Sequence, residues 1–310
     1  MHVGLEACGF GWELQRELRQ AGAQVLTFAP EPLCGKRKTN RRDAAALCRL
    51  VAARVLHGDE KAGRVVREPT PLEQRRRAIC RHRTQLVGIR GKLEAFGRNL
   101  LHDFGLHDAP DCWWGKKMWP VLQARLAREG ERGEWLSSLL WPLCEQARHT
   151  HTRLLELDKS LAEIGQAVIP VPMPKGLGDL TATLVMLEMA DPQRFKNRKQ
   201  VGSYLGCSPR EHSTGEGQLL GRIDKIGNKR LRSALTEAVW RLLKWEPRWR
   251  GFARWGEVLR EKNTGGVRKK KAVIACVRLL GIDLWRLMTR RATLADLGFR
   301  GTEQSIPVAA

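Results

Sequence analysis

Apolar residues in the first thirty positions form two short runs, separated by an amphipathic stretch. Residues 2–8 (HVGLEAC) and 23–30 (AQVLTFAP) are typical of buried strands, and residues 12–22 (WELQRELRQAG) have the spacing of a helix that stops at Gly22. This order of strand, helix and strand predicts a parallel pair. Because parallel strands bury both faces, we expect the pair to belong to a larger sheet.

The next part of the chain is helical in pattern. Residues 43–56 (DAAALCRLVAARVL) predict one apolar-striped helix that starts at Asp43. Two longer runs keep heptad spacing, which is typical of a coiled coil. The first consists of Leu72, Ile79, Leu86, Leu93 and Leu100, with Ile89 and Phe96 at the second seam position. The second consists of Leu136, Leu140, Leu143, Ala147, Thr150, Leu154, Leu157, Leu161 and Ile164.

The connection between the heptad runs, residues 105–133, contains Trp113, Trp114 and Trp119 and several glycines that can reverse the chain. We therefore predict a long antiparallel hairpin with arms at residues 72–104 and 134–166, about 50 Å long at ~1.5 Å per residue. The same heptads also permit pairing with a second subunit.

Beyond the hairpin, three prolines break the helix within residues 168–190. The motif Lys175-Gly176-Leu177-Gly178 then precedes an apolar helix. It resembles a helix-hairpin-helix turn, whose glycines expose backbone N–H groups to a DNA phosphate, although such glycines also occur in simple tight turns. Further helices are predicted at residues 229–246 and 271–288. The spacing of Trp240 and Trp245 favours a place in the core over a role as base-stacking platforms.

The charge of the chain favours a nucleic-acid partner. Among 310 residues, Lys and Arg number 55 and Asp and Glu 33, a formal net charge of +22. No apolar run approaches the ~18 residues of a membrane span, and no signal peptide is evident, so we expect a cytoplasmic, nucleoid-associated protein without membrane contact. The eight cysteines form no CxxC pair, which indicates reduced thiols. Arginines also crowd the first hairpin arm, either as solvated helix charge or as contacts to a nucleic-acid backbone.

Residues 201–243 carry the candidate chemistry. A polar loop (SPREHSTGEG) with the hydroxyls of Ser208, Ser213 and Thr214 precedes a basic segment around Gly227 and Asn228. Glycines allow close approach to a phosphate and cations neutralise it, so this arrangement suits attack on a phosphodiester. Taken alone, a serine in a loop is more often a turn or cap residue.

The motifs of this segment resemble the C-terminal domain of bacterial insertion-sequence transposases of the one-ten family. They are Pro209, Ser213-Thr214-Gly215-Glu216, and Gly227-Asn228-Lys229-Arg230-Leu231-Arg232. The resemblance implies a serine nucleophile in the loop; Ser213 is the best match and Thr214 the rival. The nucleic-acid-binding residues that follow from this interpretation are Lys175, Gly176, Gly178, Arg222, Lys225, Asn228, Lys229 and Arg232.

The N-terminal motifs Glu6-Ala7-Cys8-Gly9 and Lys38-Thr39-Asn40-Arg41-Arg42-Asp43-Ala44 resemble those of the RuvC-like domain of the same family. That domain holds Mg²⁺ with four carboxylates. Glu6 and Asp43 match, Asn40 replaces a carboxylate, and the first Asp would precede Glu6, which implies a truncated copy or a start assigned too late. Without the resemblance, the sequence indicates only that Glu6 is a polar residue at the end of a strand and that Asp43 is an acid at the start of a helix.

Together these observations predict an α+β, mainly α-helical protein. Its expected parts are an incomplete RuvC-like (RNase H-like) α/β piece at residues 1–60, a coiled-coil hairpin at 65–168, a helical transposase domain at 169–300 and a flexible tail at 301–310. The implied function is DNA breakage and rejoining by transesterification with Mg²⁺. The implied partners are DNA at the element ends and target, a structured guide RNA, and further copies of the chain in a dimer or tetramer. The alternative is a catalytically defective fragment that binds DNA or RNA, which Asn40 and the missing Asp favour.

Overall fold

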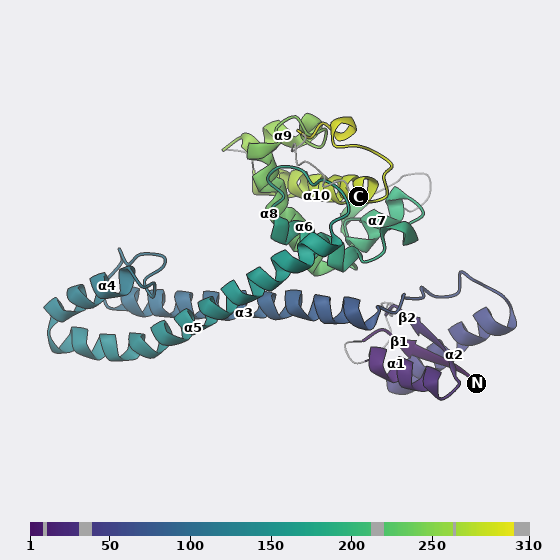
Figure 1. Ribbon diagram of the computed structural model, residues 1–310, viewed down its shortest axis with the longest axis horizontal. Coiled ribbons are helices and arrows are strands. Elements are labelled where there is room, and N and C mark those ends of the chain that lie inside the picture. Colours follow the sequence, from purple (N-terminus) through teal and green to yellow (C-terminus); the bar gives the residue numbers. More distant parts are fainter. Residues whose placement is uncertain (9–10, 31–38, 212–219, 263–264, 301–310) are drawn as a thin grey trace, which may run out of the picture. The chain divides into compact units, whose positions relative to one another are not determined.

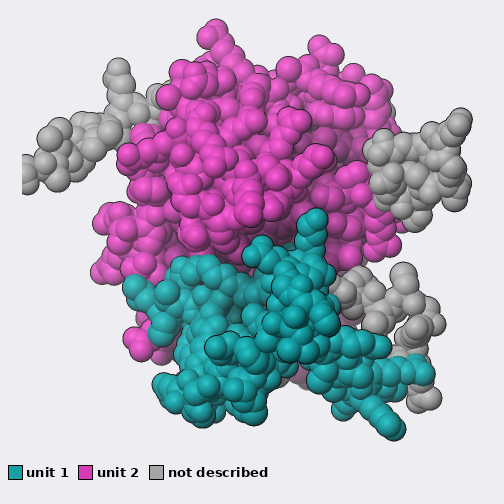
Figure 2. Space-filling model, turned by 90° about the vertical axis from the view of Figure 1, so that its right-hand side faces the viewer, with its two compact units in different colours: residues 1–74 teal, residues 75–310 magenta. Residues whose placement is uncertain are grey.

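The computed structural model divides into two compact units, residues 1–74 and 75–310 (Figure 2). The structure describes residues 1–8, 11–30, 39–211, 220–262 and 265–300. Within these residues the chain is mainly helical with a few short strands, as the sequence predicts (Figure 1). No described helix is both long and apolar enough to cross a membrane.

The first unit contains the predicted strand–helix–strand order. Strands β1 (His2–Glu6) and β2 (Gln24–Phe28) pair in parallel, with Leu5 opposite Thr27, and helix α1 (Gly11–Gln20) connects them. Gly22 follows α1 with a φ of 85°, a conformation that favours glycine. The parallel pair that the hydrophobic pattern predicted is therefore confirmed.

Helix α2 (Asn40–Leu56) begins three residues before the predicted start at Asp43. The reason is a cap: the Thr39 side chain accepts a hydrogen bond from the backbone N–H of Arg42 at 3.4 Å. Asp43 thus lies within the first turn rather than at the boundary. The helix packs closely on β1, because a Cβ atom at Gly4 would lie 2.7 Å from Val51 Cγ2.

Two long helices, α3 (Pro71–Asp103) and α5 (Glu131–Val168), run antiparallel and side by side (Figure 1). All of α5 and α3 from Arg75 onward belong to the second unit. Arg83 forms an ion pair with Asp158. About two turns further along α3, the Arg90 guanidinium lies 3.1 Å from His151 Nδ1. These helices occupy the predicted arms. That their side chains interlock as a coiled coil stays a prediction.

Burial follows the predicted heptads more closely on α5 than on α3. On α5 the predicted positions Leu136, Leu140, Ala147, Thr150, Leu154 and Leu161 are buried, and Leu143, Leu157 and Ile164 are half-buried. On α3, however, Leu72, Ile89 and Phe96 are exposed. The buried positions of α3 are Cys80, Gly97 and Leu101. Gly97 is buried because the indole of Trp113 fills the space that a side chain would occupy there. The indole N–H of Trp113 donates to the Glu94 carbonyl at 3.1 Å.

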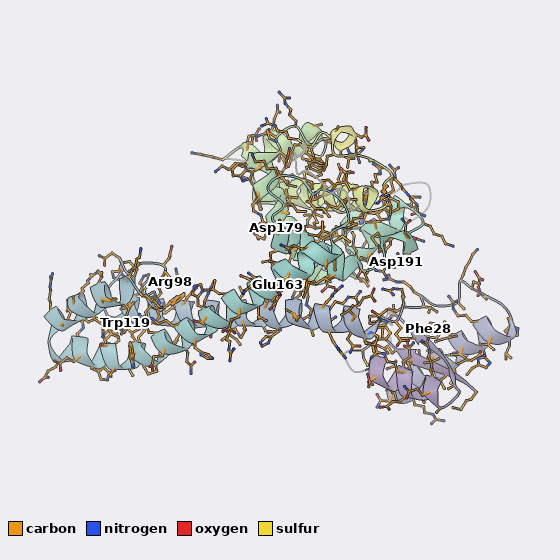
Figure 3. The ribbon with its side chains drawn as sticks, in the orientation of Figure 1. Phe28, Arg98, Trp119, Glu163, Asp179 and Asp191 are labelled. Atoms are coloured by element: carbon orange, nitrogen blue, oxygen red, sulfur yellow. The ribbon has the colours of Figure 1, made fainter. Side chains whose placement is uncertain are left out.

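The connection between the two arms is a folded tip rather than a simple loop. It includes helix α4 (Met118–Leu126) and the short helix η1 (Ala127–Glu129), which the hydrophobic pattern did not predict. The tryptophans expected in this connection are buried here, among them Trp119, which Figure 3 labels. The tip therefore has an apolar core of its own.

The remainder of the second unit is a helical bundle around α10. Its elements are α6 (Asp179–Met189), η2 (Pro192–Arg194), α7 (Arg198–Tyr204), β3 (Pro209–Glu211), β4 (Leu220–Ile223), α8 (Lys229–Trp245), α9 (Phe252–Arg260), α10 (Gly266–Met288) and η3 (Ala295–Leu297). Helix α10 begins five residues before the predicted residue 271. Its buried Asp283 accepts hydrogen bonds from Trp249 Nε1 at 2.9 Å and from Arg250 Nε at 3.0 Å, which fixes the turn that follows α8.

Candidate nucleic-acid interface

The candidate nucleophile falls between the two strands of a small β-hairpin. Strands β3 and β4 pair antiparallel, with Pro209 opposite Ile223. At the base of the hairpin, the backbone N–H of Asp224 donates to the Ser208 carbonyl at 2.8 Å. Ser213 and Thr214 belong to residues 212–219, which connect these strands and lie outside the described residues. The described residues are therefore the two strands that flank the predicted serine loop in the sequence.

Close backbone contacts attach this hairpin to the start of α8. The N–H of Lys225 donates to the Gly206 carbonyl at 3.2 Å, and the N–H of Asn228 donates to the Tyr204 carbonyl at 2.7 Å. A Cβ atom at Gly227 would collide with the backbone of Gly206, so Gly227 must be glycine for this approach. Lys225 itself has a φ of 59°, which is unusual for a residue other than glycine. The end of α7 thus positions both the hairpin base and α8.

Asn228 caps α8 and connects it to α6. Its side-chain oxygen accepts the N–H of Leu231 at 3.0 Å, and its amide nitrogen donates to Glu188 Oε2 at 2.6 Å and to the Tyr204 hydroxyl at 3.3 Å. Glu188 is buried. Both ends of the Asn228 amide are therefore engaged inside the protein, and its predicted contact with nucleic acid stays a prediction.

Cations surround the hairpin and the start of α8. The predicted binding residues on the hairpin and at the start of α8 that expose their side chains are Arg222, Lys225 and Lys229. Arg232 is half-buried and donates one guanidinium N–H to the Leu205 carbonyl at 2.6 Å. The positive end of the α8 dipole adds to the same region. Exposed cations and the N-terminal end of a helix are groups that can bind a phosphate.

The cysteine next to this hairpin does not compete as a nucleophile. Burial raises the pKa of the Cys207 thiol to about 11, although Arg232 and Arg278 favour the thiolate. Because the thiolate is the reactive form, Cys207 stays protonated and inert near neutral pH. The candidate nucleophiles are therefore the hydroxyl groups of the loop.

The second predicted phosphate site, at the start of α6, is partly occupied by the protein's own carboxylate. Gly176 and Gly178 have φ values of 88° and 75°, and α6 begins directly afterwards. The Lys175 backbone N–H donates to Glu246 Oε1 at 3.2 Å and is therefore engaged inside the protein, whereas the Lys175 side chain is exposed. Asp179, which Figure 3 labels, lies in the first turn of α6 and places a further carboxylate at this helix end.

Sequence reasoning missed two buried acids that organise this interface. Glu188 orients Asn228, and Glu246 holds the backbone of Lys175. The signal for Glu188 was present, because it is the one acid in the apolar run LVMLEMA of α6. A charge at such a position needs a buried partner. Its partner, however, lies 40 residues away and could not be identified from spacing.

The predicted metal ligands all belong to the first unit. Glu6 ends β1, and Asn40 and Asp43 lie in the first turn of α2, which packs on β1. Among the described residues, no group of three or more His, Cys, Asp and Glu side chains is arranged to hold a metal ion. Two carboxylates and one amide oxygen are ligand types that Mg²⁺ accepts, but they would leave much of its shell to water and substrate.

Comparisons with known proteins identify the class of this chain. Residues 173–254, which include the hairpin and α8, match the family model described as "Transposase IS116/IS110/IS902 family". The chain is 30% identical over 240 residues to a probable family 20 transposase of Pseudomonas aeruginosa, covering 75% of this chain and 68% of that protein. It is 26% identical over 298 residues to the putative transposase y4pF/y4sB of Sinorhizobium fredii, covering 93% and 72%. It is also 26% identical over 215 residues to a pilin gene-inverting protein of Moraxella bovis, covering 63% and 65%.

The family match and these relatives define an enzyme that transposes or recombines DNA. The chain belongs to the IS116/IS110/IS902 family of transposases. Its substrate is accordingly DNA, in agreement with the high positive charge.

Proposed function

We propose that the protein breaks and rejoins DNA by transesterification, with Ser213 as the nucleophile. The observation that carries the proposal is the attachment of the β3–β4 hairpin to the cationic start of α8 through Gly206 and Gly227. This support would keep the serine loop next to groups that bind phosphate. Thr214 is the alternative nucleophile, but its β-branched side chain is stiffer and its hydroxyl more crowded.

In the proposed first step, Ser213 Oγ attacks the phosphorus of a DNA phosphodiester. A bond between Oγ and phosphorus forms as Ser213 gives up its hydroxyl proton. The bond to one deoxyribose oxygen breaks, and that oxygen takes up a proton and leaves as a hydroxyl group. In the second step a hydroxyl of another DNA end attacks the phosphoserine and releases Ser213. Each step exchanges one phosphodiester for another, so no external energy source is needed.

The cations of α8 and the hairpin would stabilise the charge that develops on the phosphate oxygens. Arg222 and Lys225 are exposed for this purpose, and Arg232 retains guanidinium N–H groups beyond the one that Leu205 accepts. Fixed cations of this kind act without reorganisation during the reaction. Lys175, Lys229 and the turn at Gly176 and Gly178 would extend the contact along the nucleic acid.

The residues that would hold Mg²⁺ are Glu6 and Asp43, with the amide oxygen of Asn40. Bound Mg²⁺ supplies Lewis-acid stabilisation and favours ionisation of an attacking hydroxyl. The family resemblance further suggests a structured guide RNA and a homo-oligomer as partners in the reaction. These assignments rest on the motifs at Glu6 and Asp43 and on the resemblance.

A second candidate function is nucleic-acid binding without catalysis. It is favoured by Asn40, which places a neutral amide where the family motif has a carboxylate. A weaker metal site would leave binding intact, because the cations near α8 do not depend on it. The two candidates therefore differ in covalent chemistry and agree in affinity for DNA.

The test combines the protein with DNA that carries the ends of its insertion sequence, the guide RNA and Mg²⁺, and resolves covalent protein–DNA adducts on a denaturing gel. We expect Ser213→Ala to abolish adducts while DNA binding is retained. Thr214→Ala and the control Ser208→Ala should leave adducts detectable. If the effects of the first two variants are exchanged, the nucleophile is Thr214, and adducts in both would refute the serine-loop mechanism. Binding without adducts, rescued by Asn40→Asp, would support a defective metal site.

A further inference from the structure

The last position of α8, Trp245, exposes a large aromatic ring. Its exposed fraction is 45%, whereas Trp249, four residues later, is 1% exposed and belongs to the core. A single exposed apolar side chain is common and carries no meaning alone. The surroundings of Trp245 are what distinguish it.

Two lysines flank the Trp245 ring. Lys175 Nζ lies 5.3 Å and Lys244 Nζ 5.5 Å from ring centroids of the indole. Both distances are within the range of cation–π attraction. Lys244 is the neighbouring residue in α8, but Lys175 comes from the turn before α6, so its position depends on tertiary structure.

Several contacts hold Lys175 at Trp245. The buried carboxylate of Glu246 accepts the Lys175 backbone N–H at 3.2 Å and the Arg300 backbone N–H at 2.8 Å. The next residue, Gly176, has a φ of 88°, and a Cβ atom there would lie 2.8 Å from Trp245 Cβ. A buried acid and a left-handed glycine thus fix the turn against the ring.

A third cation lies one helical turn before Trp245. Arg241 is exposed, and its guanidinium donates to Thr181 Oγ1 at 2.6 Å, which ties the start of α6 to the same part of α8. Residues four apart on a helix are neighbours. Lys175, Arg241, Lys244 and Trp245 therefore form one basic and aromatic surface, which we call the Trp245 platform.

We propose that the Trp245 platform binds an unpaired nucleotide of a nucleic-acid strand. A flat indole stacks on any base, and the surrounding cations neutralise the phosphates next to it. A base in a duplex has no free face for such stacking, so the platform selects single strands. The platform lies at the opposite end of α8 from the cationic start of that helix, because Trp245 is about 24 Å along α8 from Lys229 at ~1.5 Å per residue.

This inference rests on the proposed function only in requiring nucleic acid as the partner. Its chemistry applies to unpaired DNA and to unpaired RNA alike. The turn, Arg241 and Trp245 all fall within the segment that matches the family model, residues 173–254. The platform would thus add a contact for single strands to the interface at the other end of α8.

The test measures affinities of the full chain for single-stranded DNA, single-stranded RNA and duplex DNA of equal length. We expect Trp245→Leu to weaken single-strand binding about 5- to 150-fold, since stacking on one aromatic side chain contributes that much per base. Duplex binding should change less than about twofold, and Trp245→Phe should recover most of the single-strand affinity. The strand type with the larger loss identifies DNA or RNA as the preferred source.

The matched control is Trp240→Leu, because Trp240 lies in the same helix and is 38% exposed. It should leave all three affinities unchanged. Equal losses for single strands and duplex, or equal effects of the two variants, would overturn the platform. If the unaltered protein binds no nucleic acid at all, the proposed function fails. If it binds normally but does not respond to Trp245→Leu, only the platform is refuted.

Discussion

The side-chain amide of Asn228 lies 2.6 Å from the buried carboxylate of Glu188, a residue 40 positions earlier in the chain. The same amide caps α8 through its oxygen atom. Among the described residues, the other carboxylate oxygen of Glu188 has no hydrogen-bond partner. The hydrogen bond from Asn228 therefore stabilises the buried Glu188 carboxylate of α6. Asn228 also caps the first turn of the basic helix α8.

This relationship predicts that Asn228→Ala destabilises the protein strongly. Loss of the helix cap costs about 1 kcal/mol, and a buried acid without its partner costs several kcal/mol more. The melting temperature and the urea midpoint should both fall. The control is Glu188→Gln, which keeps an oxygen for Asn228 and removes the charge. Its cost should be clearly smaller, and equal losses in the two variants would contradict the interpretation.

The helical hairpin predicts a large difference between two adjacent leucines of α5. Leu140 is fully buried, while Leu139 is 42% exposed. Leu140→Ala should therefore cost about 2–5 kcal/mol of unfolding free energy, because it removes buried methyl groups and leaves a cavity. Leu139→Ala should cost less than about 1 kcal/mol. Denaturation followed by circular dichroism measures both, and similar midpoints would show that Leu140 does not face α3.

The buried cysteines predict a loss of stability in alkaline solution. Burial raises the pKa of the Cys207 thiol to about 11 and that of the Cys276 thiol to about 12, from an ordinary value of 9.0. Above pH 9 the unfolded chain releases these thiol protons while the folded chain keeps them, so the unfolding free energy falls as the pH rises toward 11. The decline should be smaller in Cys207→Ala/Cys276→Ala than in the parent.

The same burial predicts selective alkylation. With iodoacetamide at pH 8, the exposed Cys8, Cys48 and Cys112 should react in the folded protein. Cys207 and Cys276 should react only after unfolding, because each is buried and protonated. Mass spectrometry of tryptic peptides identifies the modified sites. Rapid modification of Cys207 in folded protein would contradict the packing described around the hairpin base.

The cationic interface predicts steep salt dependence of DNA binding. If six or more phosphates are neutralised, affinity should fall by about 10³-fold or more between 50 and 200 mM salt. Replacing both Lys225 and Lys229 with Gln should reduce the slope of log K against log salt by roughly two. Lys61→Gln removes one exposed charge from the first unit and serves as the control. A flat salt response of the parent would refute an extended basic surface.

Several features of the fold could be predicted because they depend on neighbours in the chain. The parallel pair of β1 and β2 follows from two apolar runs with a helix between them. The buried stripe of α5 follows from its heptads. The prediction was wrong for Ile89 and Phe96 on α3, because periodicity identifies a face of a helix but not the partner that covers it. Trp240 and Trp245 were expected in the core because aromatic side chains are usually buried, and both are exposed.

The sequence by itself determined the family, the helical character and the segments that carry the candidate chemistry, because motifs and periodicity are local properties. Only the tertiary structure decided which turn donates its hydrogen bonds to which buried acid. Glu188 pairs with Asn228 across 40 residues, and Glu246 pairs with the Lys175 backbone across 71. The physical reason is that a buried charge must find its hydrogen-bond donors in space. Because long-range packing brings these donors to the acid, the spacing of residues in the sequence does not predict the pair.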